Sequence, residues 1–193
     1  MENSNSTKLI NVNKHTNNKI RLSRFYNMLL YFLLFSFLGW VLETFYSVYE
    51  LGHFTKRGFL YGPLCPIYGW GALILIMFFN KYKCKSVKLF ICAAIIFSIF
   101  EYAVSYAMDA LFATKWWDYS NEFFNLNGRI SIFYSFVWGI AAILFVNNIY
   151  PFFKKKINMV LSKAPYKLQI FVLQFLLVIL IIDTVMSFAH NLV

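Results

Sequence analysis

The chain of 193 residues is 60% hydrophobic and 21% aromatic, and only 13% of its residues are charged. Water-soluble domains carry about 25% charged residues, so this composition excludes an ordinary soluble protein and indicates one that lipid solvates. It also excludes a disordered chain and a disulfide-stabilised scaffold, because apolar residues dominate and there are only three Cys.

The first 24 residues have a different composition from the rest. They are rich in Asn and Lys and contain few apolar residues, which is typical of a poorly ordered segment. We therefore expect a disordered cytoplasmic tail at 1–24, followed by a single transmembrane helical domain at 25–193.

Five apolar stretches follow the tail, and each is about long enough to cross 30 Å of hydrocarbon as a helix. They lie at about 26–48, 60–79, 89–112, 130–150 and 168–189. The sequence thus predicts an all-α fold, a polytopic transmembrane helical bundle of about five spans. The connections are too short to hold a soluble catalytic domain.

Lys and Arg are distributed unequally between the two ends of these stretches. Fourteen of the 18 lie in the tail or in the connections after the second and fourth stretches. The positive-inside rule therefore predicts an amino terminus in the cytoplasm and a carboxyl terminus outside a bacterial plasma membrane. The net charge of +10 indicates contact with anionic lipid of the bilayer, and we expect no nucleic-acid partner.

Two connections that face outward in this topology, 53–71 and 114–130, do not resemble generic loops. The purely apolar part of the second stretch covers only 13 residues from Ile67, about 20 Å of helix, which is too short to cross alone. Gly62, Pro63 and Pro66 precede it, so a broken or re-entrant segment of irregular backbone is one interpretation. The other is an outer turn that closes before a tilted helix.

Four acidic residues lie inside the apolar stretches or at their edges, and the topology places all of them in the outer half. They are Glu43, Glu101, Asp109 and Asp183. A carboxylate at the centre of a membrane costs about 2.5–3.5 kcal/mol, so such residues usually face the protein interior and have a partner. We expect Arg129 to pair with Asp109 or Glu101, and Arg57 to pair with Glu43.

This acidic layer has three interpretations. The ion pairs can fix helix packing, as polar residues do in many membrane bundles. They can instead form a site for a substrate or an ion. Asp109 and Asp183 can also be edge positions in contact with water.

Several motifs resemble those of a known family. They are Gly39, Trp40 and Glu43, the run RGFLYGPLCPIYG at 57–69, Glu101, WDYS at 117–120, and FNLNGRI at 124–130. In these motifs the chain resembles the CmpB-like family of ABC-transporter permeases, small bacterial multi-pass membrane proteins. The resemblance implies a membrane subunit of a transporter whose site is formed by motif residues. Beyond the charged residues above, these are Gly58, Gly62, Pro63, Pro66, Tyr68, Gly69, Trp117, Asp118, Asn125 and Gly128.

The sequence lacks the signatures of several chemistries. It has no GxxxxGK[ST] motif, so ATP would have to be bound by a separate ATP-binding subunit, which could contact the basic amphipathic segment 151–167. The alternative is that this segment is an interfacial helix on anionic lipid. No metal motif is present, and we expect no metal and no cofactor. Cys65, Cys84 and Cys92 are predicted to be free thiols.

We therefore predict a membrane transport component in which Glu43, Glu101 and Asp183 contact a polar or cationic solute and Arg57 and Arg129 organise the site. One alternative is a membrane-embedded enzyme that acts on a lipid or envelope precursor, with Glu43 or Glu101 as general acid or base. Another is a non-catalytic assembly or regulatory subunit. A homo-oligomer is compatible with each of these.

Overall fold

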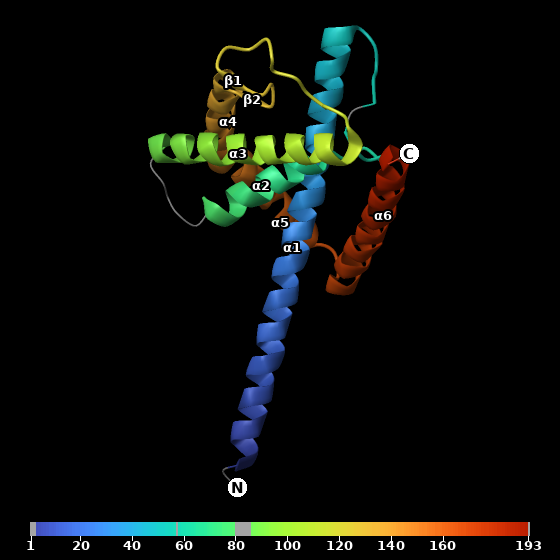
Figure 1. Cartoon of the computed structure of the whole chain (residues 1–193). Helices are drawn as coiled ribbons and strands as arrows, with labels where there is room; N and C mark the ends of the chain where they lie inside the picture. Colours follow the sequence, from blue (N-terminus) through green and yellow to red (C-terminus); the bar gives the residue numbers. More distant parts are fainter. Residues whose placement is uncertain (1–2, 57, 80–85, 193) are drawn as a thin grey trace.

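A computed structural model describes residues 3–56, 58–79 and 86–192 of the chain, with side chains from Arg24 to Asn191 in these ranges (Figure 1). The chain is mostly helical in these ranges. The elements are α1 Asn3–Leu51, α2 Pro66–Phe78, α3 Ser86–Phe112, β1 Asn125–Leu126, β2 Ile130–Ser131, α4 Ile132–Leu144, the π-helical turn η1 Phe145–Ile149, α5 Tyr150–Leu161 and α6 Tyr166–Leu192.

Among the described residues, four helical segments are long and apolar enough to cross a membrane. They are Arg24–Leu51, Ser86–Phe112, Ile132–Leu161 and Tyr166–Asn191, and α2 is a shorter apolar helix of 13 residues. The predicted all-α, polytopic membrane fold is thereby confirmed. Helix α1 includes residues 3–23, whose side chains lie outside the description, and the division into a tail and one domain stays a prediction.

Helix α2 packs along α1 and begins near the middle of the apolar part of α1. The backbone N–H of Cys65 donates to the carbonyl of Ser36 at 3.0 Å, and a Cβ atom at Gly69 would overlap the side chains of Ser36 and Phe32. Because Gly69 has no side chain, the two helices approach closely here. Residues 52–56 and 58–65 are not helical, and they run back along α1 from the Ser47–Thr55 contact to the Cys65–Ser36 hydrogen bond. We call this stretch the irregular segment; its backbone agrees with the interpretation of irregular backbone before the second helix.

Helix α4 continues into α5 through η1 without a break. The fourth apolar stretch, predicted to end at about Tyr150, and the first part of the basic segment 151–167 thus form one helical segment from Ile132 to Leu161. In the wide turn of η1, the N–H of Tyr150 bonds to the carbonyl of Phe145, five residues earlier. Pro151 lacks an N–H, and this local π-helical geometry lets it follow without ending the helix.

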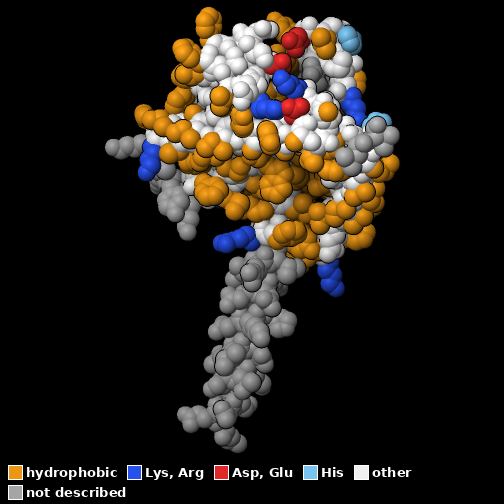
Figure 2. All heavy atoms as spheres, in the orientation of Figure 1, with side chains coloured by type: hydrophobic (Ala, Val, Ile, Leu, Met, Phe, Trp, Pro, Cys, Tyr) orange, Lys and Arg blue, Asp and Glu red, His pale blue; other side chains and the backbone are white. Residues whose placement is uncertain are grey.

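Two apolar clusters hold the helices together. One joins α1, α2 and η1–α5 around Tyr31, Phe35 and Ala72, and the other joins α2, α3 and α4 around Phe97 and Ala142. Figure 1 shows α3 crossing the direction of α1, with α4 beside it, while α6 stands at one side of the molecule. Figure 2 shows a broad hydrophobic band with charged side chains above and below it, as expected for a protein that lies in a bilayer.

Candidate functional site

A pocket of about 600 Å³ lies where the irregular segment enters between α1, α2 and α3. Its walls are mostly aromatic and aliphatic, and it also has one carboxylate, one ammonium and one thiol. The lining residues are Glu43, Lys56, Gly58, Phe59, Cys65, Pro66, Ile67, Tyr68, Trp70, Phe100, Val104, Met108, Trp116 and Trp117. The outward segments predicted to form a site thus meet at one cavity.

Glu43 supplies the carboxylate of this pocket and is half-buried. The hydroxyl of Tyr68 donates a short hydrogen bond to Glu43 Oε1. Gly39 lies one turn earlier on α1, and a Cβ atom there would overlap the Tyr68 ring. The motif residues Gly39, Glu43 and Tyr68 therefore form one unit, in which a glycine makes room for the ring that orients the carboxylate.

Glu101 is buried next to this unit, with 5% of its surface exposed. Its Oε1 accepts a hydrogen bond from the hydroxyl of Tyr119 at 2.9 Å, and its Oε2 accepts one from the indole N–H of Trp138 at 3.0 Å. Burial and the charge of Glu101 raise the pKa of Tyr119 well above its usual value, so the hydroxyl stays protonated and donates. Glu101 thus connects residues 113–131, which we call the outer loop, to α3 and α4.

The outer loop has a fixed internal structure built on the WDYS and NLNGRI motifs. Asn127 and Gly128 both have positive φ, as a type I′ turn between β1 and β2 requires. Asn125 Oδ1 accepts the N–H of Gly128, and its amide donates to the carbonyls of Ser120 and Glu122. A Cβ atom at Gly128 would overlap Asp118 and Ser120, so glycine is needed there for both its φ and its size.

Asp118 and Trp117 complete this loop. Asp118 Oδ1 accepts hydrogen bonds from the N–H of Ser120 at 3.0 Å and from its hydroxyl at 2.5 Å. These bonds lower the pKa of the exposed Asp118 carboxyl. The indole N–H of Trp117 donates to the carbonyl of Arg129 at 3.0 Å, while the ring lines the pocket.

Arg129 pairs with Asp109, one of the two carboxylates predicted as its partner, and not with Glu101, the other. The distance between Arg129 Nη2 and Asp109 Oδ2 is 2.5 Å, and the exposed fractions of the two side chains are 12% and 33%. Arg129 also donates to the carbonyl and hydroxyl of Ser105. It is thereby anchored to one face of α3, where Ser105 and Asp109 are four residues apart.

Asp183 binds backbone rather than a side-chain cation. Its two carboxylate oxygens accept the N–H groups of Tyr61 and Gly62, each at 2.9 Å, and Ser187 adds further bonds. A Cβ atom at Gly62 would lie 2.8 Å from Asp183 Oδ2, so a larger residue would displace the carboxylate. Through these bonds α6 holds the irregular segment in place.

Replacing Asp183 with Asn is expected to lower the free energy of unfolding by about 2 kcal/mol. Asn keeps one acceptor, but its NH₂ group then faces a backbone donor of the irregular segment. Asp118→Asn is the matched control, because Oδ1 accepts both bonds there and Asn retains Oδ1. Thermal unfolding of the two purified variants measures the difference, and equal stability would contradict this role of Asp183.

Most of the residues predicted from the sequence fall into three groups. Glu43, Gly58, Pro66, Tyr68 and Trp117 meet at the pocket. Glu101, Asp109, Asp118, Asn125, Gly128 and Arg129 shape the outer loop and its attachment, while Gly62 and Asp183 fix the irregular segment. Gly69 lies at the contact of α1 and α2, and Pro63 is exposed on the loop. Arg57 and its predicted pairing with Glu43 lie outside the described residues, as does Cys84.

The sequence did not predict the two hydrogen-bond partners of Glu101, which are Tyr119 and Trp138. Tyr119 lies within the WDYS motif, but nothing in the spacing distinguishes its hydroxyl from that of other tyrosines. Trp138 lies six residues after the start of α4, in an apolar run where a Trp is expected to pack in the core. A buried carboxylate needs hydrogen-bond donors, and the indole N–H of a Trp inside an apolar helix is such a donor. Trp138 was therefore the residue whose position could have indicated a partner for Glu101.

No group of three or more His, Cys, Asp or Glu side chains that could hold a metal ion occurs in the described part of the chain. A comparison with curated proteins and with solved structures finds no significant match. A family model does match, over residues 30–188, which include the pocket, the irregular segment and the outer loop. The chain belongs to the family described as "Putative ABC-transporter type IV".

Proposed function

We propose that the chain is the membrane-spanning permease subunit of a transporter and that it binds an organic cation in the pocket beside Glu43. Membership of the ABC-transporter family supports a role in transport. The sequence has no nucleotide-binding motif, so ATP would be hydrolysed by a separate subunit. The observation that carries the choice of solute is the half-buried Glu43 carboxylate in an aromatic pocket.

The walls of the pocket favour a positively charged solute with apolar parts. Trp70, Trp116 and Trp117 line it, and the faces of such rings attract cations. Within the described part of the chain, the Glu43 carboxylate forms no salt bridge and accepts a hydrogen bond from Tyr68. Lys56 also lines the pocket, and its ammonium is turned toward the Tyr61 ring, 4.1 Å from the ring centroid.

The volume also suits such a solute. Pockets for small molecules enclose about 300–1,000 Å³ and combine apolar walls with a few polar groups that fix orientation. The cavity of about 600 Å³ lies within this range. Glu101 and Asp183 do not line it, and their carboxylate oxygens accept hydrogen bonds from other parts of the protein. The proposal therefore gives the contact with solute to Glu43 alone among the four acids.

Binding of tetraphenylphosphonium to the purified full chain tests this proposal. Glu43→Gln is expected to weaken binding about tenfold, because the amide removes the charge that attracts the cation but keeps an acceptor for Tyr68. Glu50→Gln is the matched control, since Glu50 is exposed further along the same helix. Unchanged binding by Glu43→Gln, or equal loss in both variants, would contradict the proposal, as would turnover of a lipid precursor by the chain alone.

A further inference from the structure

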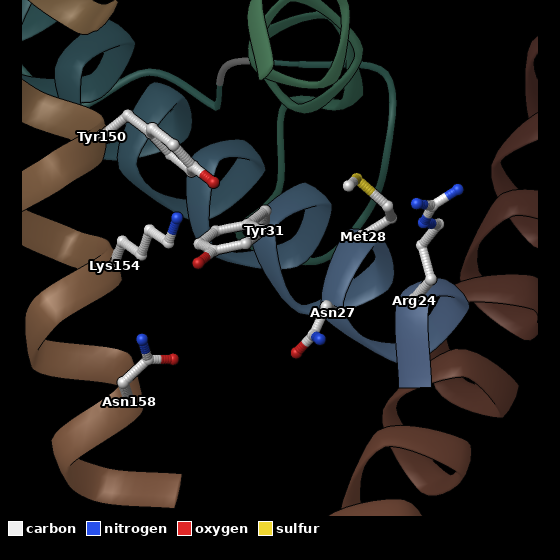
Figure 3. A pocket seen from close by; sticks show the side chains of 7 residues that line it. All are labelled: Arg24, Asn27, Met28, Tyr31, Tyr150, Lys154 and Asn158. Carbon is white, nitrogen blue, oxygen red and sulfur yellow. The ribbon is translucent and has the colours of Figure 1, made fainter. Parts of the chain in front are cut away.

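A second pocket, of about 290 Å³, lies at the opposite end of the apolar part of α1 (Figure 3). It forms between α1, at the turns that begin with Arg24, and the face of α5 that carries Lys154. Its lining consists of two cations, two amides, two tyrosines and one methionine: Arg24, Lys154, Asn27, Asn158, Tyr31, Tyr150 and Met28. None of these lining residues is acidic.

We infer that this pocket binds the phosphate headgroup of an anionic phospholipid. Figure 3 shows Lys154 of α5 pointing toward Tyr31 of α1, with Asn158 one turn beyond Lys154, while Asn27 lies further along α1 and Arg24 lies beyond it with its guanidinium turned away from Lys154. Cations and amide donors are the groups that bind phosphate oxygens. No side-chain hydrogen bond of Asn27 or Asn158 occurs among the described residues, so both amides are available to a ligand.

The depth of the pocket in the membrane selects a lipid over a dissolved anion. Arg24 is the first residue of the apolar span Arg24–Leu51. A second apolar span begins at Ile132, and Lys154 lies 22 residues further along it, which is about 33 Å of helix. That distance is close to the thickness of the hydrocarbon layer. Both cations thus lie at the level of lipid headgroups, on the side to which most Lys and Arg of the chain belong.

The pocket is also attached to a rigid part of the fold. Tyr31 and Tyr150 are buried, and their ring centroids are 5.3 Å apart. Lys154 Nζ lies 5.6 Å from the centroid of the Tyr150 ring, which directs the ammonium toward the groove. A bound headgroup would connect α1 to α5. Basic pockets between membrane helices bind lipid headgroups in other proteins by the same combination of charge and depth.

Thermal unfolding of the purified full chain with added phosphatidylglycerol, phosphatidylcholine or inorganic phosphate tests this inference. We expect saturable stabilisation by phosphatidylglycerol and none by phosphatidylcholine or inorganic phosphate. Equal stabilisation by inorganic phosphate would overturn the lipid and identify a dissolved anion as the ligand. Equal stabilisation by the two lipids would overturn the preference for a net negative charge.

Two neighbouring lysines supply a matched pair of variants. Lys154→Gln is expected to weaken phosphatidylglycerol binding about fivefold, as loss of one basic group near an anionic lipid surface does. Lys155→Gln removes the same charge from an exposed position that does not line the pocket, and we expect binding to be unchanged. Equal weakening by both would show diffuse attraction to the membrane and would overturn the site.

Asn158→Asp gives a second variant that does not remove a cation. A carboxylate in the groove would repel the phosphate, so we expect binding at least as weak as that of Lys154→Gln. Circular dichroism and the unfolding temperature without lipid show whether each variant is folded. Wild-type affinity in a folded Asn158→Asp variant would overturn the inference.

Discussion

Replacing Gly69 with Ala is expected to lower the free energy of unfolding by about 2 kcal/mol. The added Cβ would lie 2.8 Å from the carbonyl oxygen of Phe32 and closer still to the hydroxyl of Ser36. Overpacking of this kind costs about 3 kcal/mol, and the better helix propensity of Ala returns about 1 kcal/mol. Thermal unfolding in detergent measures the loss. Because α2 would move away from α1, the pocket at its first turn would also lose its shape.

Gly71→Ala is the matched control, since it makes the same change two residues later in the same helix. A Cβ atom at Gly71 would lie 3.2 Å from Cε1 of Phe97, the edge of a ring that can shift by a few tenths of an ångström. We therefore expect Gly71→Ala to be nearly neutral. A similar loss in both variants would show that the effect comes from the helix itself and would contradict the close α1–α2 contact.

Replacing Glu101 with Leu is expected to destabilise the chain by about 3 kcal/mol and to release the outer loop. Leu accepts no hydrogen bond, so the hydroxyl of Tyr119 and the indole N–H of Trp138 would each lose a buried partner. Each unsatisfied donor costs about 1–3 kcal/mol. Limited proteolysis of the loop at 113–131 and thermal unfolding measure the two consequences. We expect cleavage to be faster than in the wild type.

Glu101→Gln separates hydrogen bonding from the loss of side-chain shape. The amide oxygen can accept from Trp138, and the NH₂ group can donate to the hydroxyl oxygen of Tyr119, which can rotate its proton away. We expect a loss of about 1 kcal/mol and an intact loop. A neutral Glu101→Leu variant, or a Gln variant as unstable as the Leu variant, would contradict the proposed attachment.

Much of the fold follows from the sequence because lipid imposes simple rules on it. The second stretch is predicted at about 60–79, with its purely apolar part from Ile67, and helix α2 begins at Pro66. Pro66 occupies a first-turn position where its missing N–H costs nothing. The bulge at η1 was not predictable, because the residues FVNNI fit an α-helix locally. The crossing of α3 over α1 also depends on packing between distant side chains, which the periodicity of one helix does not encode.

The candidate site was predictable in part. The need of a membrane carboxylate for a cation predicted that Arg129 pairs with Asp109 or Glu101, and Asp109 is its partner. The same reasoning predicted that Glu101 and Asp183 contact a solute, whereas in the structure their carboxylates accept hydrogen bonds from donors of the protein. For Asp183 these donors are the backbone N–H groups of Tyr61 and Gly62, which exist at every residue and leave no mark in the sequence.

The account depends most on the pocket beside Glu43 being open to water within an apolar fold. Val104→Cys and Ala103→Cys test this in a chain whose native cysteines are replaced by Ala. Val104 lines the pocket, whereas neighbouring Ala103 lies outside it on the surface of the apolar span Ser86–Phe112, where we expect lipid to cover it. A cationic methanethiosulfonate reagent should label Val104→Cys faster than an anionic one and leave Ala103→Cys unlabelled, and Glu43→Gln should remove the preference for the cation. Equal labelling of both positions, or a preference for charge that survives Glu43→Gln, would contradict the account.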